Sequence, residues 1–199
     1  YLNKDVQETS KTNVALRLEY ELLKDFNFKV NLGNNKSNSF RKRFEPQSLN
    51  FQGDDNDVLN VQGSRLNAEL QEDNTRTDRR SIENILAYNK TFGKHKIGLL
   101  GVVSYEDYET IRNRVNGLFP FDAPNNDVQV LAGATETFAT GDIWERSLTG
   151  KLFRLQYGFD GKYLFSGSIR RDGSSKFSEK NRFGTFFGLS TGWNIHEEN

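Results

Sequence analysis

Hydrophobic and polar residues alternate strictly in the first part of the chain. Between residues 13 and 23, alternate positions carry the apolar or aromatic side chains Val14, Leu16, Leu18, Tyr20 and Leu22. The positions between them are mostly charged. Period-two alternation of this length predicts a β-strand with one apolar and one wetted face. The alternation resumes over residues 26–32 after Lys24-Asp25, so we expect a hairpin with a two-residue connection.

A second hairpin is predicted around Phe92-Gly93. Its strands are residues 81–91 and 94–107, and both of their faces carry apolar side chains. A third hairpin joins residues 146–158 to residues 162–171. Its connection, Asp160-Gly161, suits a type I′ turn, in which both central residues need positive φ.

A last strand is predicted over residues 182–195. Gly184, Gly188 and Gly192 share one face of this strand, and Phe183, Phe187 and Trp193 share the other. We count about six strands in the chain.

The segments between these hairpins are polar. Residues 34–79 and 108–145 are predicted to be long loops, and residues 171–181 a shorter one. Short turns alternating with long loops are typical of outer-membrane barrels. The predicted strands of about 10–13 residues also fit the roughly 9–11 residues that a tilted strand needs to cross a bilayer.

Composition agrees with a barrel wall. Hydrophobic residues make up only 35% of the 199 residues, yet aromatic residues reach 13%, including 16 Phe. A disordered chain would lack these rings, whereas a barrel wall has one lipid-facing face and aromatic borders. The fold class expected is therefore all-β, with antiparallel up-and-down strands that form part of a large transmembrane β-barrel.

Charge and cysteine content exclude several functions. Lys and Arg number 27, as do Asp and Glu, and no basic run stands out, so we expect no nucleic-acid partner. The chain has no cysteine and therefore no disulfide or thiolate metal site. The acidic run at residues 54–57 lacks the spacing of an EF-hand loop. We expect no metal and no cofactor.

No catalytic motif is present. His95 and His196 are the only histidines, and neither lies in a zinc-protease arrangement. The chain has no nucleophile elbow and no phosphate-binding glycine loop. We therefore assign no catalytic residue and expect that the protein is not an enzyme.

Candidate site residues follow from the strand pattern and from the loops. The polar positions opposite the first apolar stripes are candidates for lining a lumen: Arg17, Glu19, Glu21, Asn27, Lys29 and Asn31. Residues Arg170, Arg171 and Asp172 are candidates for a ligand-binding loop tip, because guanidinium groups recognise carboxylate, phosphate or sugar oxygens; the alternative is a purely structural turn.

Two aromatic residues of the second long loop are also candidates. Phe119 and Phe121 could stack against a sugar or a partner protein. They could equally anchor the base of their own loop.

The C-terminal third of the chain carries a recognisable pattern. It includes Tyr163, the run Arg170-Arg-Asp-Gly-Ser-Ser-Lys-Phe177, then Asn181-Arg-Phe-Gly184 and Gly192-Trp193. This pattern resembles the barrel of SusC/RagA-like TonB-dependent outer-membrane transporters. The residues that match are architectural markers rather than an active site.

The resemblance implies a function. Such transporters are large barrels of about 22 strands with a plug in the lumen. They import glycans or peptides across the bacterial outer membrane, driven by TonB and paired with a SusD-like surface lipoprotein. We expect residues 1–199 to be a partial barrel that contains no plug domain, lies in contact with outer-membrane lipid and lines the importer without chemistry on the substrate.

The residues also allow a second hypothesis. A soluble all-β module that binds carbohydrate or protein would bury the same apolar stripes between two sheets. It would be monomeric without detergent.

Overall fold

The computed structural model describes residues 4–48, 65, 67–120 and 130–198. Its strands are β1 (Lys4–Leu23), β2 (Phe26–Glu45), β3 (Ala68–Phe92), β4 (His95–Phe119), β5 (Glu136–Phe159), β6 (Tyr163–Ser174) and β7 (Phe183–Trp193). Three short 3-10 helices are Leu131–Gly133, Glu179–Asn181 and Ile195–Glu197. Among the described residues, no helix has the length and apolar composition needed to cross a membrane.

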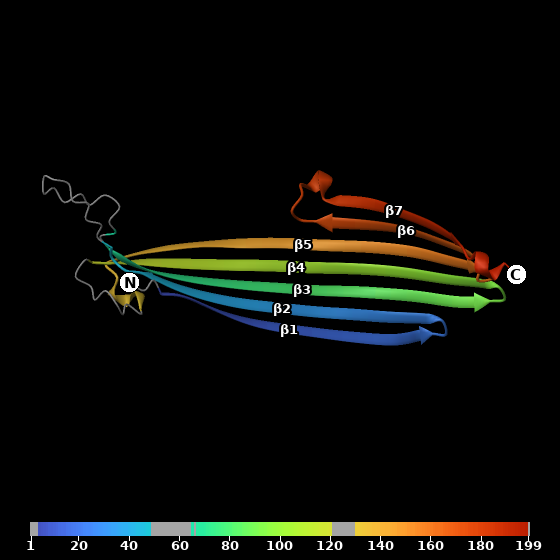
Figure 1. Cartoon of the computed structure of the whole chain (residues 1–199), viewed down its shortest axis with the longest axis horizontal. Helices are drawn as coiled ribbons and strands as arrows, with labels where there is room; N and C mark the ends of the chain where they lie inside the picture. Colours follow the sequence, from blue (N-terminus) through green and yellow to red (C-terminus); the bar gives the residue numbers. More distant parts are fainter. Residues whose placement is uncertain (1–3, 49–64, 66, 121–129, 199) are drawn as a thin grey trace. The chain divides into compact units, whose positions relative to one another are not determined.

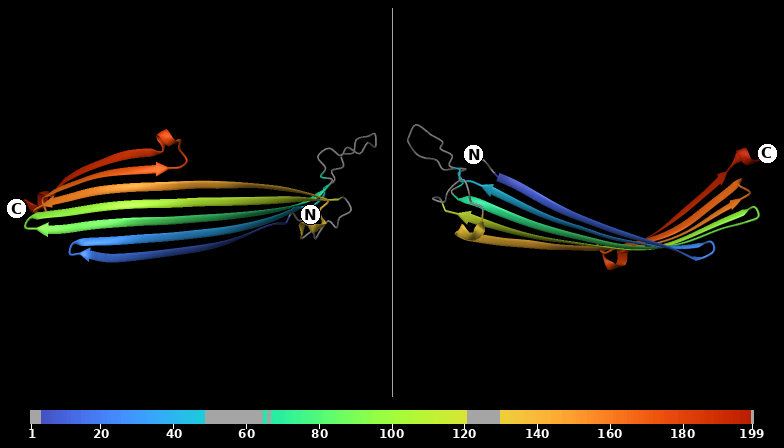
Figure 2. Two further views of the ribbon diagram at one scale, coloured as in Figure 1. Left: turned by 180° about the vertical axis from the view of Figure 1, so that it is seen from behind. Right: turned by 90° about the horizontal axis from the view of Figure 1, so that it is seen from below.

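The strands form one sheet in sequence order, β1-β2-β3-β4-β5-β6-β7 (Figure 1). Views from two other directions show the same order (Figure 2). Each strand therefore pairs with its neighbours in the chain, as the antiparallel pairing of β5 with β6 and of β6 with β7 illustrates. The expected fold class, all-β with up-and-down strands, is confirmed.

The strand count and the loop boundaries need correction. The sheet has seven strands rather than about six. The predicted loop 34–79 contains parts of two strands, because β2 continues to Glu45 and β3 begins at Ala68. The predicted loop 108–145 is largely strand, since β4 continues to Phe119 and β5 begins at Glu136. The acidic run at residues 54–57 lies outside the described residues.

The residues divide into two compact units. We call residues 12–36, 78–109 and 145–199 the turn unit, because they contain the three short turns. We call residues 1–11, 37–77 and 110–144 the loop unit. Strands β1 to β5 contribute residues to both units.

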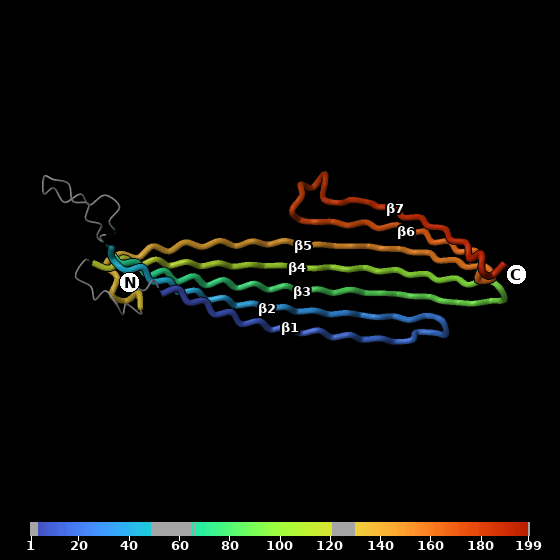
Figure 3. The backbone as a smooth tube through the Cα atoms, in the orientation of Figure 1, coloured from blue at the N-terminus to red at the C-terminus, as the bar shows by residue number. Residues whose placement is uncertain are grey.

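The short turns lie together in the turn unit, as the backbone trace shows (Figure 3). The turn between β5 and β6 is closed by the N–H of Lys162, which donates to the carbonyl of Phe159 over 2.9 Å. Its central residues Asp160 and Gly161 have φ of 55° and 70°. Positive φ at both positions defines the type I′ turn that the Asp-Gly pair predicts. The N–H of Asp160 also donates to the carbonyl of Lys94 in the neighbouring turn over 2.7 Å.

The two faces of the turn unit differ in chemistry. The pairing register places Tyr157, Phe165 and Thr191 in one row across β5, β6 and β7, and Gln156, Ser166 and Ser190 in the next. Because successive side chains in a strand point to opposite faces, these two rows lie on opposite faces. One face is thus rich in aromatic and aliphatic residues, and the other is rich in Gly, Ser and polar residues.

The apolar face is exposed. Its large side chains include Leu16, Leu18, Val103, Phe153, Ile169, Phe187 and Leu189. Leu16 is 50% exposed and Leu189 is 80% exposed. The described residues form only one sheet, so no second sheet within this part of the chain covers these side chains. A sandwich, which the second hypothesis requires, is therefore not the fold of the described residues.

The buried hydrophobic cluster lies in the loop unit. Phe44, Ala68, Leu70 and Phe119 are buried, and the half-buried Leu131 and Ala134 pack against them. Phe119, at the end of β4, is only 3% exposed. It therefore anchors the base of its own loop and offers no face for stacking against a ligand. The other aromatic candidate, Phe121, lies outside the described residues.

Candidate functional site

Polar side chains on β1, β2 and β3 are linked across the polar face of the turn unit. The Nε of Arg17 donates to Oδ1 of Asn31 over 3.0 Å, and Nδ2 of Asn31 donates to Oε2 of Glu83 over 2.9 Å. Beside these hydrogen bonds, Nζ of Lys29 lies 2.8 Å from Oε1 of Glu19. Four of the six lumen candidates are thus joined in two contacts.

The other two lumen candidates, Glu21 and Asn27, share this face. Glu21 lies two positions from Glu19 on β1, and Asn27 lies two positions from Lys29 on β2. Residues two positions apart in a strand point to the same face. Sequence reasoning placed all six candidates on one face, and the side-chain contacts agree with that placement. It missed Glu83, because the alternation in the second hairpin is weaker and both of its faces carry apolar residues.

The same face contains a shallow pocket farther along the sheet, where glycines and small residues occur. The pocket is lined by residues that include Glu83, Ser104, Gly150, Arg170 and Asp172. A Cβ on Gly150 would lie 2.8 Å from Oγ of Ser104 and 3.1 Å from Oδ1 of Asp172. Glycine at this position therefore lets neighbouring polar side chains approach the backbone.

The predicted loop-tip residues lie in a strand rather than at a loop tip. Arg170, Arg171 and Asp172 belong to β6, and each is paired with residues of both β5 and β7. The Nε of Arg170 donates to both carboxylate oxygens of Asp172 over 2.8 Å. Arg171 points to the opposite, apolar face and lies over the ring of Phe183, 4.9 Å from its centroid. The two arginines therefore cannot hold one ligand between them.

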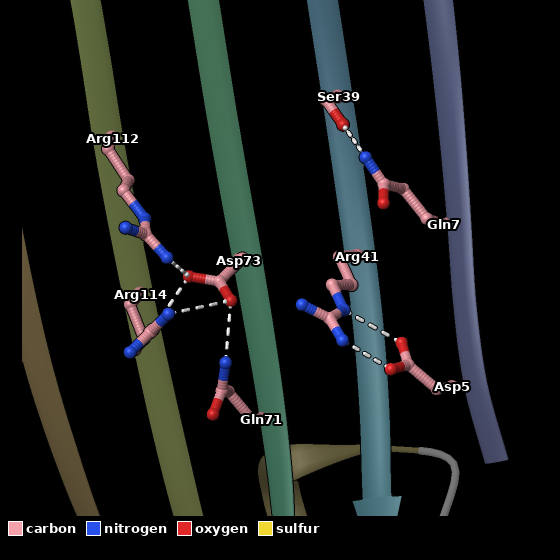
Figure 4. Close-up of polar contacts among 8 residues, drawn as sticks. All are labelled: Asp5, Gln7, Ser39, Arg41, Gln71, Asp73, Arg112 and Arg114. Carbon is pink, nitrogen blue, oxygen red and sulfur yellow. Dashed lines mark hydrogen bonds and ion pairs between the residues drawn. The ribbon is translucent and has the colours of Figure 1, made fainter.

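The loop unit contains a second polar site, centred on Asp73 of β3 (Figure 4). Arg114 binds its carboxylate in a bidentate manner, with Nε 2.7 Å from Oδ1 and one terminal nitrogen 3.2 Å from Oδ2. Arg112 donates to Oδ1 over 3.2 Å, and Nε2 of Gln71 donates to Oδ2 over 2.6 Å. The side chain of Asp73 is only 7% exposed, so this charge is shielded from water while its arginine partners remain accessible.

These contacts alter the protonation of Asp73. Partial burial by itself raises the pKa of the carboxyl group, but the hydrogen bonds from Arg114, Gln71 and Arg112 and the positive charge of Arg114 lower it more. The pKa of Asp73 is consequently below its ordinary value. The group is a carboxylate at neutral pH and holds two arginine side chains in place.

A smaller ion pair accompanies this site on the first two strands. Nε of Arg41 donates to Oδ1 of Asp5 over 2.8 Å, and a terminal nitrogen of Arg41 pairs with Oδ2. The side-chain amide of Gln7 donates to the hydroxyl of Ser39 over 3.0 Å (Figure 4). The hydrogen bond from Arg41 lowers the pKa of Asp5.

The Asp73 site was missed because its residues fall in segments predicted to be loops. A signal was nevertheless present in the sequence. Gln71 and Asp73 are two residues apart, as are Arg112 and Arg114. That spacing puts each pair on one face of a strand. Among the described residues, no group of three or more His, Asp or Glu side chains could hold a metal ion.

Sequence comparison relates the chain to TonB-dependent receptors. It is 32% identical over 190 residues to TonB-dependent receptor P39 of Formosa agariphila and 28% identical over 181 residues to receptor P3 of the same organism. These matches cover 92% and 90% of this chain. A shorter stretch of 46 residues is 54% identical to TonB-dependent receptor SusC of Bacteroides thetaiotaomicron. No protein-family model matches the chain.

Structural comparison finds the same relationship in the fold. The sheet is similar to part of the RagAB peptide importer in its closed-closed state, with a TM-score of 0.83 and 20% identity over 98% of this chain. A second structure, of the RagAB peptide transporter, gives a TM-score of 0.79. The resemblance to SusC/RagA-like proteins is confirmed, and these relatives are named receptors and transporters rather than enzymes.

The chain is short relative to these proteins. It spans 17% of the length of receptors P3 and P39. It spans 21% of the matched chain in the closed-closed structure of RagAB.

Proposed function

We propose that this chain, a homologue of TonB-dependent receptors with the fold of part of the RagAB transporter, forms a section of the wall of a bacterial outer-membrane nutrient importer. The apolar face of the turn unit contacts lipid, and its polar face lines the lumen. We assign the loop unit to the extracellular side, because such barrels carry their longer loops there.

The apolar band of the turn unit is the observation that carries this proposal. On β4 the outward-facing residues run from His95 to Tyr105, an interval that corresponds to about 33 Å of strand. With the usual strand tilt of about 45°, this length gives a band about 23 Å high, close to the roughly 25 Å of a transmembrane barrel. The exposed side chains within it are suited to contact with acyl chains.

Aromatic residues lie at both borders of this band, as expected at the two membrane interfaces. Near the short turns, His95 lies between the rings of Phe92 and Phe159, and its Nδ1 is 2.8 Å from the hydroxyl of Tyr157. At the other border, the hydroxyl of Tyr105 contacts Oγ of Ser147 at 3.4 Å. Beyond this border, ion pairs such as Arg80–Asp107 replace the apolar side chains.

The remaining parts of the proposal rest on the relatives. The substrate is a peptide, in line with the name of the RagAB peptide importer, or a glycan, which the resemblance to SusC/RagA-like transporters also allows. The partners are a SusD-like surface lipoprotein and TonB, both acting through the full-length transporter. The linked side chains from Arg17 to Glu83 and the arginines around Asp73 would meet the substrate as it passes along the wall.

Membrane insertion tests the proposal. In the full-length transporter, the substitution Leu16→Arg would put a cation on the lipid face, at a cost of about 2–4 kcal/mol near the bilayer midplane. We expect far less folded protein in the outer-membrane fraction, measured by the difference in gel mobility between heated and unheated samples.

Glu21→Arg provides the matched control, because residue 21 lies on the polar face of the same strand. It should assemble in the outer membrane at the parental level. Normal assembly and uptake of Leu16→Arg would contradict the proposed function.

A further inference from the structure

The apolar face of the turn unit contains two cations where the apolar band ends. On β5 the outward-facing residues Phe159, Tyr157, Leu155 and Phe153 are followed by Lys151. On β6 the outward-facing residues Tyr163, Phe165, Gly167 and Ile169 are followed by Arg171. Both cations are exposed. Lys151 lies eight residues before Phe159, the last residue of β5, and Arg171 lies eight residues after Tyr163, the first residue of β6.

These two cations are direct cross-strand neighbours. Lys151 pairs with Arg171 in the register of β5 and β6. Side chains that face each other in this way have Cβ atoms about 4.5–5.5 Å apart, and like charges in this arrangement destabilise a sheet. An anion bound between them would relieve the repulsion.

Neighbouring outward-facing cations are neutralised by the protein itself. Arg80 of β3 lies 3.9 Å from Oδ2 of Asp107, and Lys36 of β2 lies 3.9 Å from Oδ2 of Asp78. In contrast, no carboxylate of the described residues lies within 4 Å of Lys151 or Arg171. The ring of Phe183 supports the guanidinium of Arg171 and leaves its N–H groups available.

A groove on the same face leads to the two cations. It is lined by apolar side chains that include Leu86, Val103, Phe153 and Ile169, and Lys151 and Arg171 belong to its lining. Gly101 of β4 forms part of its floor, and a Cβ added there would have no neighbour within 4 Å. The absence of a side chain at this outward position therefore leaves space between the neighbouring apolar residues.

We propose that this groove binds a phosphate-bearing lipid, with an acyl chain over Gly101 and the phosphate between Lys151 and Arg171. Guanidinium and ammonium groups are strong partners of phosphate oxygens. The cations lie at the border of the band that is farther from the short turns, which matches the headgroup level of the outer leaflet. This inference rests on the proposed membrane location of the chain.

Lipid binding by the purified full-length transporter tests the proposal. In detergent solution, native mass spectrometry would measure its affinity for dioleoyl phosphatidic acid, dioleoyl phosphatidylcholine and inorganic phosphate. The parent should prefer phosphatidic acid. The double variant K151Q/R171Q should bind it about thirtyfold more weakly, since each basic residue near a lipid headgroup contributes about fivefold.

Two further variants separate the contribution of the two cations from that of the apolar groove. R80Q removes an outward-facing cation that is already paired with Asp107, so it should change the affinity for phosphatidic acid by less than about twofold. Gly101→Leu fills the groove and should weaken the binding of phosphatidic acid without changing that of inorganic phosphate.

Other results would overturn the assignment. These are equal binding of phosphatidic acid by K151Q/R171Q and the parent, an equal loss in R80Q, or inorganic phosphate binding as tightly as the lipid. A dimer of the transporter without bound lipid would instead show that a second copy covers the groove. Insertion of the parent into membranes is measured separately, so failure of the proposed function would be recognised independently of the lipid result.

Discussion

Asp73 is a charged residue that the fold shields from water although it lies in a polar part of the sheet. Its carboxylate accepts hydrogen bonds from Arg112, Arg114 and Gln71. A shielded carboxylate with these partners orders two long side chains that would otherwise move freely in water. We infer that it stabilises the loop unit and fixes the orientation of the arginines.

The substitution Asp73→Asn tests this role. It keeps the shape of the side chain but removes the charge, and we expect it to lower the free energy of unfolding by about 2 kcal/mol at pH 7, the range for hydrogen bonds to charged groups. The measurement is a urea titration of the full-length transporter in detergent micelles.

The same titration at different pH values provides the control. The pKa of Asp73 is lower in the folded sheet than its ordinary value of 3.8. Its stabilising contribution is therefore complete at pH values well above 3.8 and is lost as the pH falls through the lowered pKa. The difference between parent and variant should shrink under these acid conditions. A difference that is absent at pH 7, or unchanged by acid, would contradict the role assigned to the charge.

Some parts of the strands were predictable from the alternation of polar and apolar residues, and others were not. The three hairpins and the Asp160-Gly161 turn were predictable because apolar residues recur along the strands and the turn residues favour positive φ. The continuation of β2 to Glu45 was not predictable from alternation. Lys36 and Lys42 interrupt the row of alternate positions that also contains Phe40 and Phe44, so the period-two signal weakens there.

The candidate site was predictable to a similar extent. Alternation placed Arg17, Lys29 and Asn31 on one face, and the structure brings them into contact with partners on that face. The assignment of Arg170 and Arg171 to one loop tip was wrong, because adjacent residues of a strand point to opposite faces. Because Arg171 was assigned to a loop tip, its position on the outward face of a strand was not predicted.

The type I′ turn gives a prediction for the third hairpin. Gly161 has a φ of 70°, a conformation in which a residue with a Cβ is strained by about 1–2 kcal/mol. Gly161→Val should therefore lower the urea midpoint of the full-length transporter and slow formation of the heat-modifiable folded form. Gly101→Ala serves as the control, because a Cβ at residue 101 meets no atom within 4 Å. Equal midpoints for the two variants would show that the turn conformation does not limit stability.

The chain contains two kinds of sheet surface, one in each compact unit. In the turn unit, one face is apolar and exposed and the other is polar. In the loop unit, polar residues such as those around Asp73 accompany a small buried cluster centred on Leu70. The proposed function assigns the first kind of surface to the bilayer and the second to water.

The central claim is that lipid covers the side chains of the apolar stripes, and β1 offers the most direct test. The chain contains no cysteine, so spin labels can be attached at single cysteines introduced at each residue from 14 to 22 in a cysteine-free full-length transporter in bilayers. Electron paramagnetic resonance then compares the accessibility of each label to oxygen, which concentrates in lipid, and to a water-soluble nickel chelate. We predict high oxygen accessibility at residues 14, 16, 18, 20 and 22 and high nickel accessibility at residues 15, 17, 19 and 21. Labels at the even-numbered positions that neither reagent reaches, or that only the nickel chelate reaches, would contradict the account.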